Sequence, residues 1–361
     1  MKAFLTVLLL LVLVTAAVAG YVWLAIEKPY GHPPPEGVFV EIPHGVSQRT
    51  VSRLLANNGI VRSAEIFELY ARRHPRRSLQ AGEYFFDHPM SGKDVYWKIA
   101  NGEVYVQPFT VKEGDTIFDI AHNLEAAKYM APGEFLKAAQ DASQIQAFAP
   151  GAKTLEGFLF PATYNLPRHA SAGDLTTMMV RKFREAMQRI SPDHLDPLMP
   201  GTPLLSVITL ASIVEAETPK PEERPLVAGV YTNRLRKDML LQCDPTVIYA
   251  LRAADKYKPP LLLKDLAYAS PYNTYVHAGL PPGPIGNPGE TSIRAALSPA
   301  PTDYLYFVAN TQGGHFFAAT LAEHNQNVAK YHRLLNGEPA DPPVTETPHP
   351  GTAGSAHKGK R

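Results

Sequence analysis

The N-terminal stretch from Phe4 to Ile26 contains no charged residue, and it constrains the fold of this chain more than any other feature. At ~1.5 Å per helical residue it is long enough to cross the ~30 Å hydrocarbon core of a bilayer. Lys2 precedes the stretch, and Tyr21 and Trp23 suit the aromatic belt at its far end. The stretch therefore predicts a single transmembrane helix with a very short cytoplasmic end.

A removed signal peptide is the alternative, because Ala17-Val18-Ala19 resembles a cleavage site of small residues. The apolar run continues beyond that site to Ile26, which favours an uncleaved anchor. Either reading exports the body of the protein. We expect a single-pass protein of the cytoplasmic (inner) membrane whose body lies on the periplasmic, extracytoplasmic side.

Composition excludes several classes of protein. A net charge of +1, from 35 basic and 34 acidic residues, argues against a nucleic-acid binder, which usually has a strong basic excess. The single cysteine, Cys243, excludes a disulfide within the chain and a zinc site built from thiolates. His315 and His324 lack the spacing of a metal motif, and no phosphate loop or serine-nucleophile motif occurs. The sequence predicts neither a metal nor another cofactor.

Composition also divides the chain. We expect five segments: a cytoplasmic stub and anchor (1–27), a Pro-rich spacer (28–37), a region of two related units (38–150), a larger domain (151–336) and a disordered tail (337–361). The predicted fold class is α+β. The domain over 151–336 should contain a small antiparallel sheet from the regions of Leu159, Tyr304 and Phe316, with the Tyr304 strand central and helices packed around it.

One strand-turn-helix-helix pattern occurs twice, over residues 38–73 and 106–140. Ser47 or Thr50 is expected to cap the first helix of the first copy, and Ser91 a short helix between the copies. Placing Gly45 on Gly114 aligns three further apolar pairs without gaps: Val51 with Ile120, Leu55 with Leu124, and Ile66 with Phe135. The pattern predicts a duplicated βαα unit, with chance agreement of two amphipathic patterns as the alternative. The unit resembles a LysM module, and the segment FTVKEGDTIFDIAHNL is the closer copy. We do not assume that it binds sugar.

A long apolar run from Leu204 to Val214 ends in a carboxylate, Glu215. The run predicts a buried helix, and both burial and a helix C-terminus disfavour a carboxylate anion. A Glu that keeps its proton near neutral pH can act as a general acid. The alternative is an ion pair with Arg224 or Arg234. Glu217 lies about 200° further around the helix, so it cannot face the same spot, and we interpret it as a surface or capping residue.

Other polar residues are candidates for binding substrate, each with a structural alternative. Asp244 precedes Pro245 and could initiate a turn, and Glu156 could order the turn at Gly157. The predicted substrate-binding residues are Glu156, Tyr164, Gln242, Asp244, Thr246, Tyr272, Asn273 and Thr274.

Several segments together carry a family resemblance. They are LEGFLFPATY (155–164), ASIVEAET (211–218), ER..VAGVYTNRL (223–235), M.LQCDPTVIYAL (239–251), YNTY...GLPPGPI.NPG (272–289), YLYFVA and GGHFF. The chain resembles the YceG-like family of membrane-anchored endolytic murein transglycosylases, from the anchor to about Leu335. The resemblance implies cleavage of peptidoglycan glycan strands beside penicillin-binding cell-wall synthases. It also implies that Glu215, in the ASIVE segment, is the catalytic glutamate. The domain over 151–336 would then be the catalytic transglycosylase domain, and 38–150 the LysM-like region.

The chemistry of such a lyase agrees with a lone acid. A glycoside hydrolase needs two carboxylates, whereas in a lytic transglycosylase the C6 hydroxyl of muramic acid attacks its own anomeric carbon. Glu215 would protonate the leaving oxygen and then accept the hydroxyl proton, leaving a 1,6-anhydro-MurNAc end. Two alternatives stay open at this point. One is a non-catalytic glycan-binding scaffold, and the other is a two-carboxylate muramidase that uses Glu215 with Asp244.

Overall fold

The computed structural model describes residues 2–74, 78–195, 201–337 and 339. Two compact units divide the chain: Met1–Thr110 with Thr163–Ser171, and Val111–Ala162 with Ala172–Arg361. The division falls at Thr110, so most of the strand of the second βαα copy lies in the first unit, and the two helices of that copy lie in the same unit as Glu215. Most of the predicted tail lies outside the described residues. The domain boundaries expected from the sequence stay predictions.

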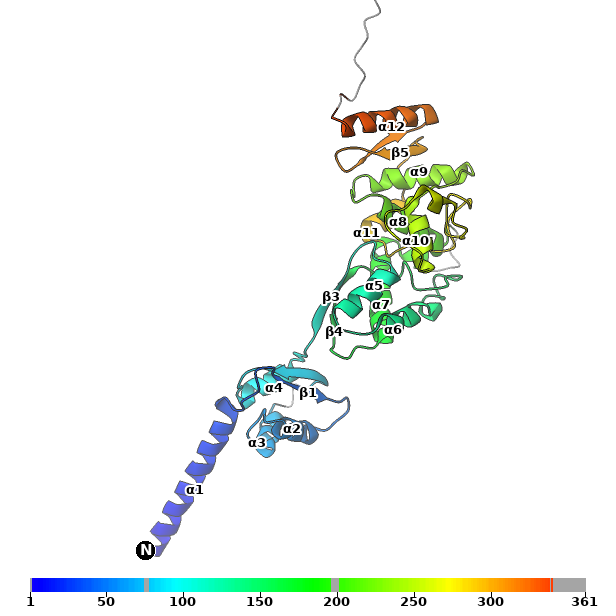
Figure 1. Cartoon of the computed structure of the whole chain (residues 1–361). Coiled ribbons are helices and arrows are strands. Elements are labelled where there is room, and N and C mark those ends of the chain that lie inside the picture. Colours follow the sequence, from blue (N-terminus) through cyan, green and yellow to red (C-terminus); the bar gives the residue numbers. More distant parts are fainter. Residues whose placement is uncertain (1, 75–77, 196–200, 338, 340–361) are drawn as a thin grey trace, which may run out of the picture. The chain divides into compact units, whose positions relative to one another are not determined.

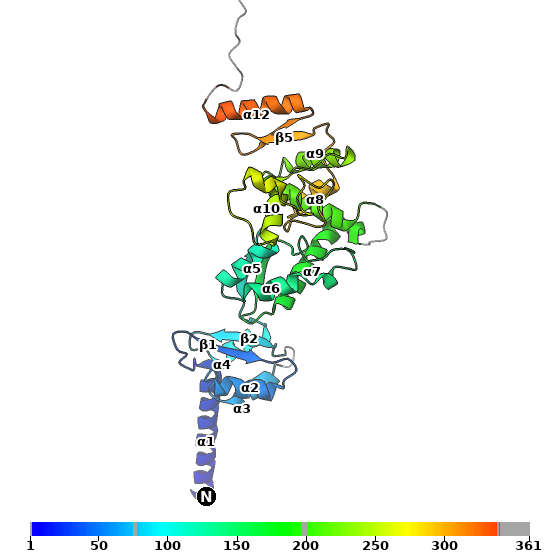
Figure 2. The ribbon, with the colours of Figure 1, turned by 45° about the vertical axis from the view of Figure 1, so that its right-hand side comes forward.

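The first unit holds the N-terminal helix and the first βαα copy (Figures 1 and 2). Its elements are α1 (Lys2–Glu27), β1 (Val38–Ile42), α2 (Gln48–Asn57), α3 (Ala64–Arg72), β2 (Gly82–Phe86) and α4 (Gly92–Ala100). Within α1, Phe4–Glu27 is the one stretch among the described residues that is long and apolar enough to cross a membrane. It is compatible with a single-pass anchor.

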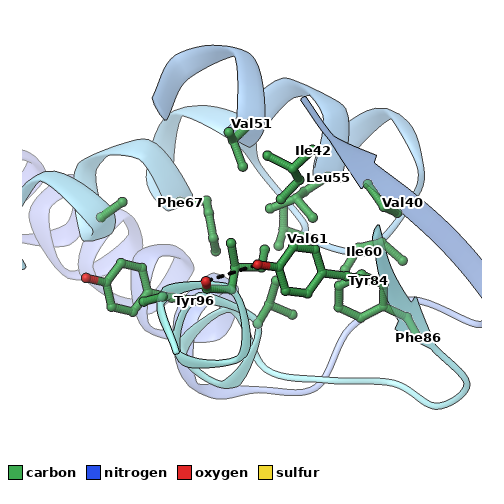
Figure 3. Close-up of a cluster of buried hydrophobic side chains, with 14 residues drawn as sticks. Val40, Ile42, Val51, Leu55, Ile60, Val61, Phe67, Tyr84, Phe86 and Tyr96 are labelled. Atoms are coloured by element: carbon green, nitrogen blue, oxygen red, sulfur yellow. Dashed lines mark hydrogen bonds between the residues drawn. The ribbon is translucent and has the colours of Figure 1, made fainter. Parts of the chain in front are cut away.

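The core of the first unit forms where α2, α3 and α4 cover one face of the β1–β2 ribbon (Figure 3). The strands are antiparallel, with Val38 opposite Phe86. Alternate strand residues such as Val40 and Tyr84 point inward and are at most 2% exposed. The Tyr84 hydroxyl is satisfied in this core, because the Gln80 carbonyl lies 2.9 Å and the Ile99 carbonyl 3.2 Å from it as acceptors.

Hydroxyl caps begin the helices of the first unit as the sequence predicts. Ser47 and Ser91 accept hydrogen bonds from the third backbone N–H of α2 and α4, which supplies a partner for an otherwise unpaired donor. The Pro-rich segment after α1 is less free than the predicted spacer. The Tyr30 N–H donates to the Met90 carbonyl at 2.9 Å, so this segment is joined to the rest of the unit.

The second βαα copy has the layout of the first. It comprises β3 (Gln107–Val111), α5 (Ile117–Ala126) and α6 (Pro132–Ala139), and β3 pairs with β4 (Ala162–Leu166) as β1 pairs with β2. Gly45 and Gly114 occupy equivalent turns in the two copies, with φ of 76° and 83°, values at which a glycine has no steric penalty. The last predicted pair is shifted by one residue. The residue equivalent to buried Phe135 is Phe67, because α6 begins 68 residues after α3 (132 − 64) and not 69.

Helices dominate the remainder of the second unit. They are α7 (Ala172–Ile190), α8 (Leu204–Glu217), α9 (Arg224–Arg236), α10 (Asp244–Ala253), α11 (Glu290–Leu297) and α12 (Leu321–Leu335), with short 3-10 segments at Ala142–Gln144, Pro192–Leu195 and Leu263–Ala267. Helix α8 is buried along most of its length and packs against α9, α10 and α11. It extends two residues beyond Glu215 and ends before Pro219, which cannot continue a helix.

The α+β prediction is confirmed, but two details of the predicted sheet are wrong. The strands β5 (Tyr306–Ala309) and β6 (His315–Ala318) form an antiparallel pair covered by α12. This sheet has two strands, so the Tyr304 region does not supply a central strand. Leu159 is not in it, because its N–H donates to the Asn287 side chain at 2.9 Å in the turn before β4.

Candidate active site

Glu215 lies at a junction of three segments inside the second unit. Its Oε1 lies 2.6 Å from the Arg224 guanidinium, and its Oε2 accepts the Gly289 N–H at 2.9 Å. Both charged side chains are only 5% exposed. The pKa of Glu215 is raised overall, because burial outweighs the Gly289 N–H and the Arg224 guanidinium, which lower it. Protein donors thus engage both oxygens, which is the ion-pair alternative that the sequence left open.

Arg224 and Gly289 extend this junction to the second βαα copy. The Arg224 guanidinium also lies 3.6 Å from the Glu113 carboxylate and contacts the Thr291 hydroxyl. A Cβ on Gly289 would lie 2.0 Å from Glu113 Oε1, so a larger residue at this position would displace the Glu113 side chain. Three segments therefore meet at Glu215: the turn of the second βαα copy, helix α8 and the Asn287-Pro288-Gly289 loop. This arrangement indicates a structural role for its carboxylate.

Glu156 lies at a similar junction, where its side chain is buried away from solvent. Glu156 is 1% exposed. Its carboxylate accepts one hydrogen bond from the Ile117 N–H at the start of α5 and another from the Asn287 side-chain amide at 3.1 Å. Burial raises the pKa of the Glu156 carboxyl to about 8, against the lowering effect of the Ile117 N–H. Of the two roles considered from the sequence, these contacts favour the structural one.

The raised pKa of Glu156 predicts a pH-dependent stability. Between about pH 4.5 and 8 the folded chain retains a proton that the unfolded chain has released, so stability falls as pH rises through this range. Glu156→Gln cannot ionise. As pH rises through this range, the free energy of unfolding of Glu156→Gln should increase relative to that of the wild type by up to ~1.4 kcal/mol per pH unit. Unfolding of the detergent-solubilised chain at pH 5 and 8 measures this, with the exposed Glu134→Gln as control. Parallel pH curves for wild type and Glu156→Gln would contradict the raised pKa.

Glu217 faces a different place from Glu215, as the helical spacing predicts. It contributes to a cavity of about 200 Å³ between the end of α8, α9 and β5. The lining residues are Glu217, Tyr231, Arg234, Leu241, Gln242, Asp244, Tyr275 and Phe307. The interpretation of Glu217 as a surface or capping residue misses this position, because the walls of the cavity come from segments distant in the sequence.

Two hydroxyl groups fix the carboxylates of this cavity. The Tyr231 hydroxyl donates to Glu217 Oε1 at 2.6 Å, and the Tyr275 hydroxyl donates to Asp244 Oδ1 at 2.6 Å. Burial raises the pKa of Glu217 and the Asp244 charge raises it further, while donors on Cys243 and Tyr231 lower it. A carboxyl with a raised pKa on a cavity wall is suited to donate a proton.

The remaining predicted residues divide between the cavity and its support. Gln242 and Asp244 line the cavity, and the Gln242 N–H donates to the Thr274 carbonyl at 3.1 Å. Thr246 and Thr274 are buried and bond to each other at 2.9 Å beneath it. Asn273 is also buried, with its amide on the Leu266 and Tyr268 carbonyls.

Two predicted binding residues lie away from the Glu217 cavity. Tyr272 lines a separate cavity of about 140 Å³ with Thr154 and Leu205, among others, and its ring lies 4.9 Å from that of Tyr249. Tyr164 lies in β4 and belongs to the first unit. The sequence missed Tyr231, Arg234 and Tyr275. The spacing of Tyr231 and Arg234, three apart on one helix, is the signal that could have placed both on one face.

Comparison with known proteins agrees with this architecture. The sequence model described as the YceG-like family matches residues 40–330. The chain belongs to the YceG-like family. It is similar to a Bacillus subtilis (strain 168) protein named endolytic murein transglycosylase, with 35% identity over 311 residues, which cover 81% of this chain and 84% of that protein.

Two further similarities extend the family assignment. A protein of the same name from Streptococcus pneumoniae (strain D39) is 31% identical, and the match covers 81% of this YceG-like chain but 58% of the longer relative. The 2.6 Å crystal structure of a yceG-like protein from Listeria monocytogenes is 34% identical, with a TM-score of 0.50. That match covers 81% of this chain and 99% of the Listeria chain.

Proposed function

We propose that this chain is an endolytic murein transglycosylase, a lyase that cuts peptidoglycan glycan strands between MurNAc and GlcNAc. The family and the shared name of its relatives support the substrate and the enzyme class. The observation that carries the chemistry is the position of Glu217. Its half-buried carboxyl lies on a cavity wall beside Gln242 and Asp244.

Glu217 is the general acid and base in this proposal, in place of Glu215. The protonated carboxyl donates to the oxygen that leaves MurNAc C1 as the glycosidic bond breaks. The C6 hydroxyl of the same MurNAc then forms a bond to C1, and its proton returns to the Glu217 carboxylate. Atoms and charge balance without water, and the product carries a 1,6-anhydro-MurNAc end. Glu215 is less suited to this role because Arg224 and Gly289 hold its two oxygens.

Asp244 distinguishes the lyase from a two-carboxylate muramidase. Because Asp244 lines the same cavity as Glu217, these two form the carboxyl pair that a hydrolase would use. In the lyase Asp244 is a supporting charge held by Tyr275. We expect Asp244→Asn to lower turnover by roughly tenfold, well short of the ~10²–10⁴-fold loss expected when a general acid is removed.

Digestion of purified sacculi followed by mass analysis measures both turnover and product. The matched control is Asp255→Asn, an exposed acid that does not line the cavity. Anhydro ends, with Asp244→Asn still active, support the lyase. Reducing ends that have gained one water, together with an Asp244→Asn loss as large as that of Glu217→Gln, would favour the muramidase. Binding of glycan without any cleavage would favour the scaffold.

The predicted anchor determines on which side of the membrane we propose that this chemistry takes place. We infer that α1 spans the cytoplasmic membrane, and that the rest of the first unit and the second unit lie on the extracytoplasmic side, where glycan strands are made. The apolar length of α1 supports the span. Penicillin-binding synthases are the expected partners, because they supply nascent strands. Endolytic cutting predicts fragments of many lengths from long strands, whereas an exolytic enzyme would release disaccharides only.

A further inference from the structure

An apolar groove of about 480 Å³ lies between the last turns of α1 and helix α3 in the first unit. Its lining residues are Ala19, Val22, Trp23, Ile26 and Glu27 of α1, and Ile66, Leu69, Tyr70 and Arg73 of α3 and its C-cap. Leu69 and Trp23 are 50% and 53% exposed, which leaves large apolar side chains open. Open apolar patches of this kind mark a binding surface.

The groove is fixed within the unit and does not depend on a free helix end. Ala25 and Ile26 are buried, and a Cβ on Gly92 of α4 would lie 2.8 Å from the Ala25 carbonyl oxygen. Helix α1 also packs against α3 and α4. The glycine thus permits close contact between α4 and the end of α1. That contact holds the two walls of the groove in place.

The stripe that α3 presents to α1 is apolar with one cation at its end. Ile66, Leu69, Tyr70 and Arg73 follow the i, i+3, i+4, i+7 spacing of one helix face. Arg73 is exposed, and no described carboxylate lies within ion-pair distance of it. The neighbouring Arg72 is different, because it pairs with Glu68 at 2.5 Å outside the groove.

The depth of the groove follows from the proposed anchor, on which this inference rests. Trp23 suits the membrane interface, and Ala19 lies four residues, or ~6 Å, further toward the hydrocarbon core. One wall of the groove therefore lies at the level of the lipid headgroups and the first methylene groups. At that depth α3 resembles an interfacial helix, whose apolar face is buried among lipids.

We propose that this groove binds an anionic phospholipid, with an acyl chain between α1 and α3 and the phosphate on Arg73. Arginine is suited to phosphate because its guanidinium can form two parallel hydrogen bonds. A second transmembrane helix is a poorer occupant, since membrane helices pack closely through small residues. Leu69, Trp23 and Tyr70 are large. The bound lipid would hold the first unit against the membrane surface.

Nitroxide labels on the full-length chain in phosphatidylglycerol/phosphatidylcholine nanodiscs test the depth. Single cysteines replace Leu69, Glu65 and Val12 in a Cys243→Ser background. Glu65 is an exposed control outside the groove on the same helix, and Val12 reports the anchor. We expect the label at 69 to be more accessible to oxygen than to a water-soluble nickel chelate, and the label at 65 to show the reverse. A water-exposed label at 69 with a lipid-buried label at 12 would overturn the lipid site and leave the anchor intact. A water-exposed label at 12 would overturn the anchor and this site with it.

Charge selectivity is tested by lipid titration of the chain in neutral detergent. Trp97→Phe leaves Trp23 as the single tryptophan, and brominated phosphatidylglycerol should quench its fluorescence. One arginine near an anionic lipid corresponds to about a fivefold change in affinity. We expect Arg73→Gln to raise the half-quenching concentration by about that factor, and Arg72→Gln to leave it unchanged. Equal curves for both variants, or equal quenching by brominated phosphatidylcholine, would overturn the anionic site. A cysteine at position 69 that cross-links to the α1 helix of a second copy would instead assign the groove to dimerisation.

Discussion

Glu217→Gln should reduce turnover of glycan strands by ~10²–10⁴-fold while the fold survives. The amide keeps the shape of the side chain and can still accept the Tyr231 hydroxyl bond, but it cannot give a proton to the leaving oxygen. Substrate binding should change little, because the other cavity residues are untouched. Single-turnover digestion of sacculi, with anhydro products counted by mass, measures the loss.

Glu215→Gln is the matched control, since it makes the same change two residues away on the same helix. It weakens the pair with Arg224 and should lower stability, but turnover below its unfolding temperature should remain within about tenfold of the wild type. The opposite ranking, with Glu217→Gln active and Glu215→Gln inactive, would return the acid to Glu215. Equal and complete loss in two folded variants would mean that both carboxyls are needed.

Features encoded over short distances were predictable from the sequence. Ser47 and Ser91 cap the expected helices, and the glycines at 45 and 114 mark the duplicated turn. These predictions succeed because a hydroxyl cap or a positive φ is decided by a few neighbouring residues. The single residue that separates Phe67 from the predicted Ile66 arose in the loop between helices, where periodicity gives no signal.

The choice between two glutamates could not be made from helix periodicity. Spacing shows that Glu215 and Glu217 face different directions, but their surroundings come from elsewhere. Arg224 follows the prolines after α8, and Gly289 lies 74 residues beyond Glu215 in sequence. Burial alone made Glu215 attractive as an acid, and only the positions of its partners show that its oxygens are engaged.

A similar limit applies to the residues thought to bind sugar. Thr246, Asn273 and Thr274 have the polar side chains of a carbohydrate site, yet their bonds go to neighbouring backbone and hydroxyl groups. Buried polar groups need partners, so the loop that holds Asn273 and Thr274 and the first turn of α10 use their own side chains to satisfy the backbone. A polar motif can therefore indicate a rigid loop as readily as a binding site.

Arg224→Met should destabilise the second unit by about 3–5 kcal/mol, because it leaves the Glu215 carboxylate buried without its cation. The exposed Arg236 lies on the same helix, and Arg236→Met should cost well under ~1 kcal/mol. Denaturant unfolding of the detergent-solubilised chain measures both. Similar costs for the two variants would show that Arg224 does not neutralise a buried charge.

The double variant Arg224→Met with Glu215→Leu joins stability to mechanism. Replacing a buried ion pair by apolar side chains of similar volume is often neutral or stabilising by ~1–4 kcal/mol, so this chain should recover most of the stability that Arg224→Met loses. It has no carboxyl at position 215. If Glu217 is the acid, the recovered chain should still release anhydro ends at a rate near that of the wild type. A folded and stable double variant without activity would assign the proton transfer to Glu215, and the ion pair would then be part of the catalytic machinery.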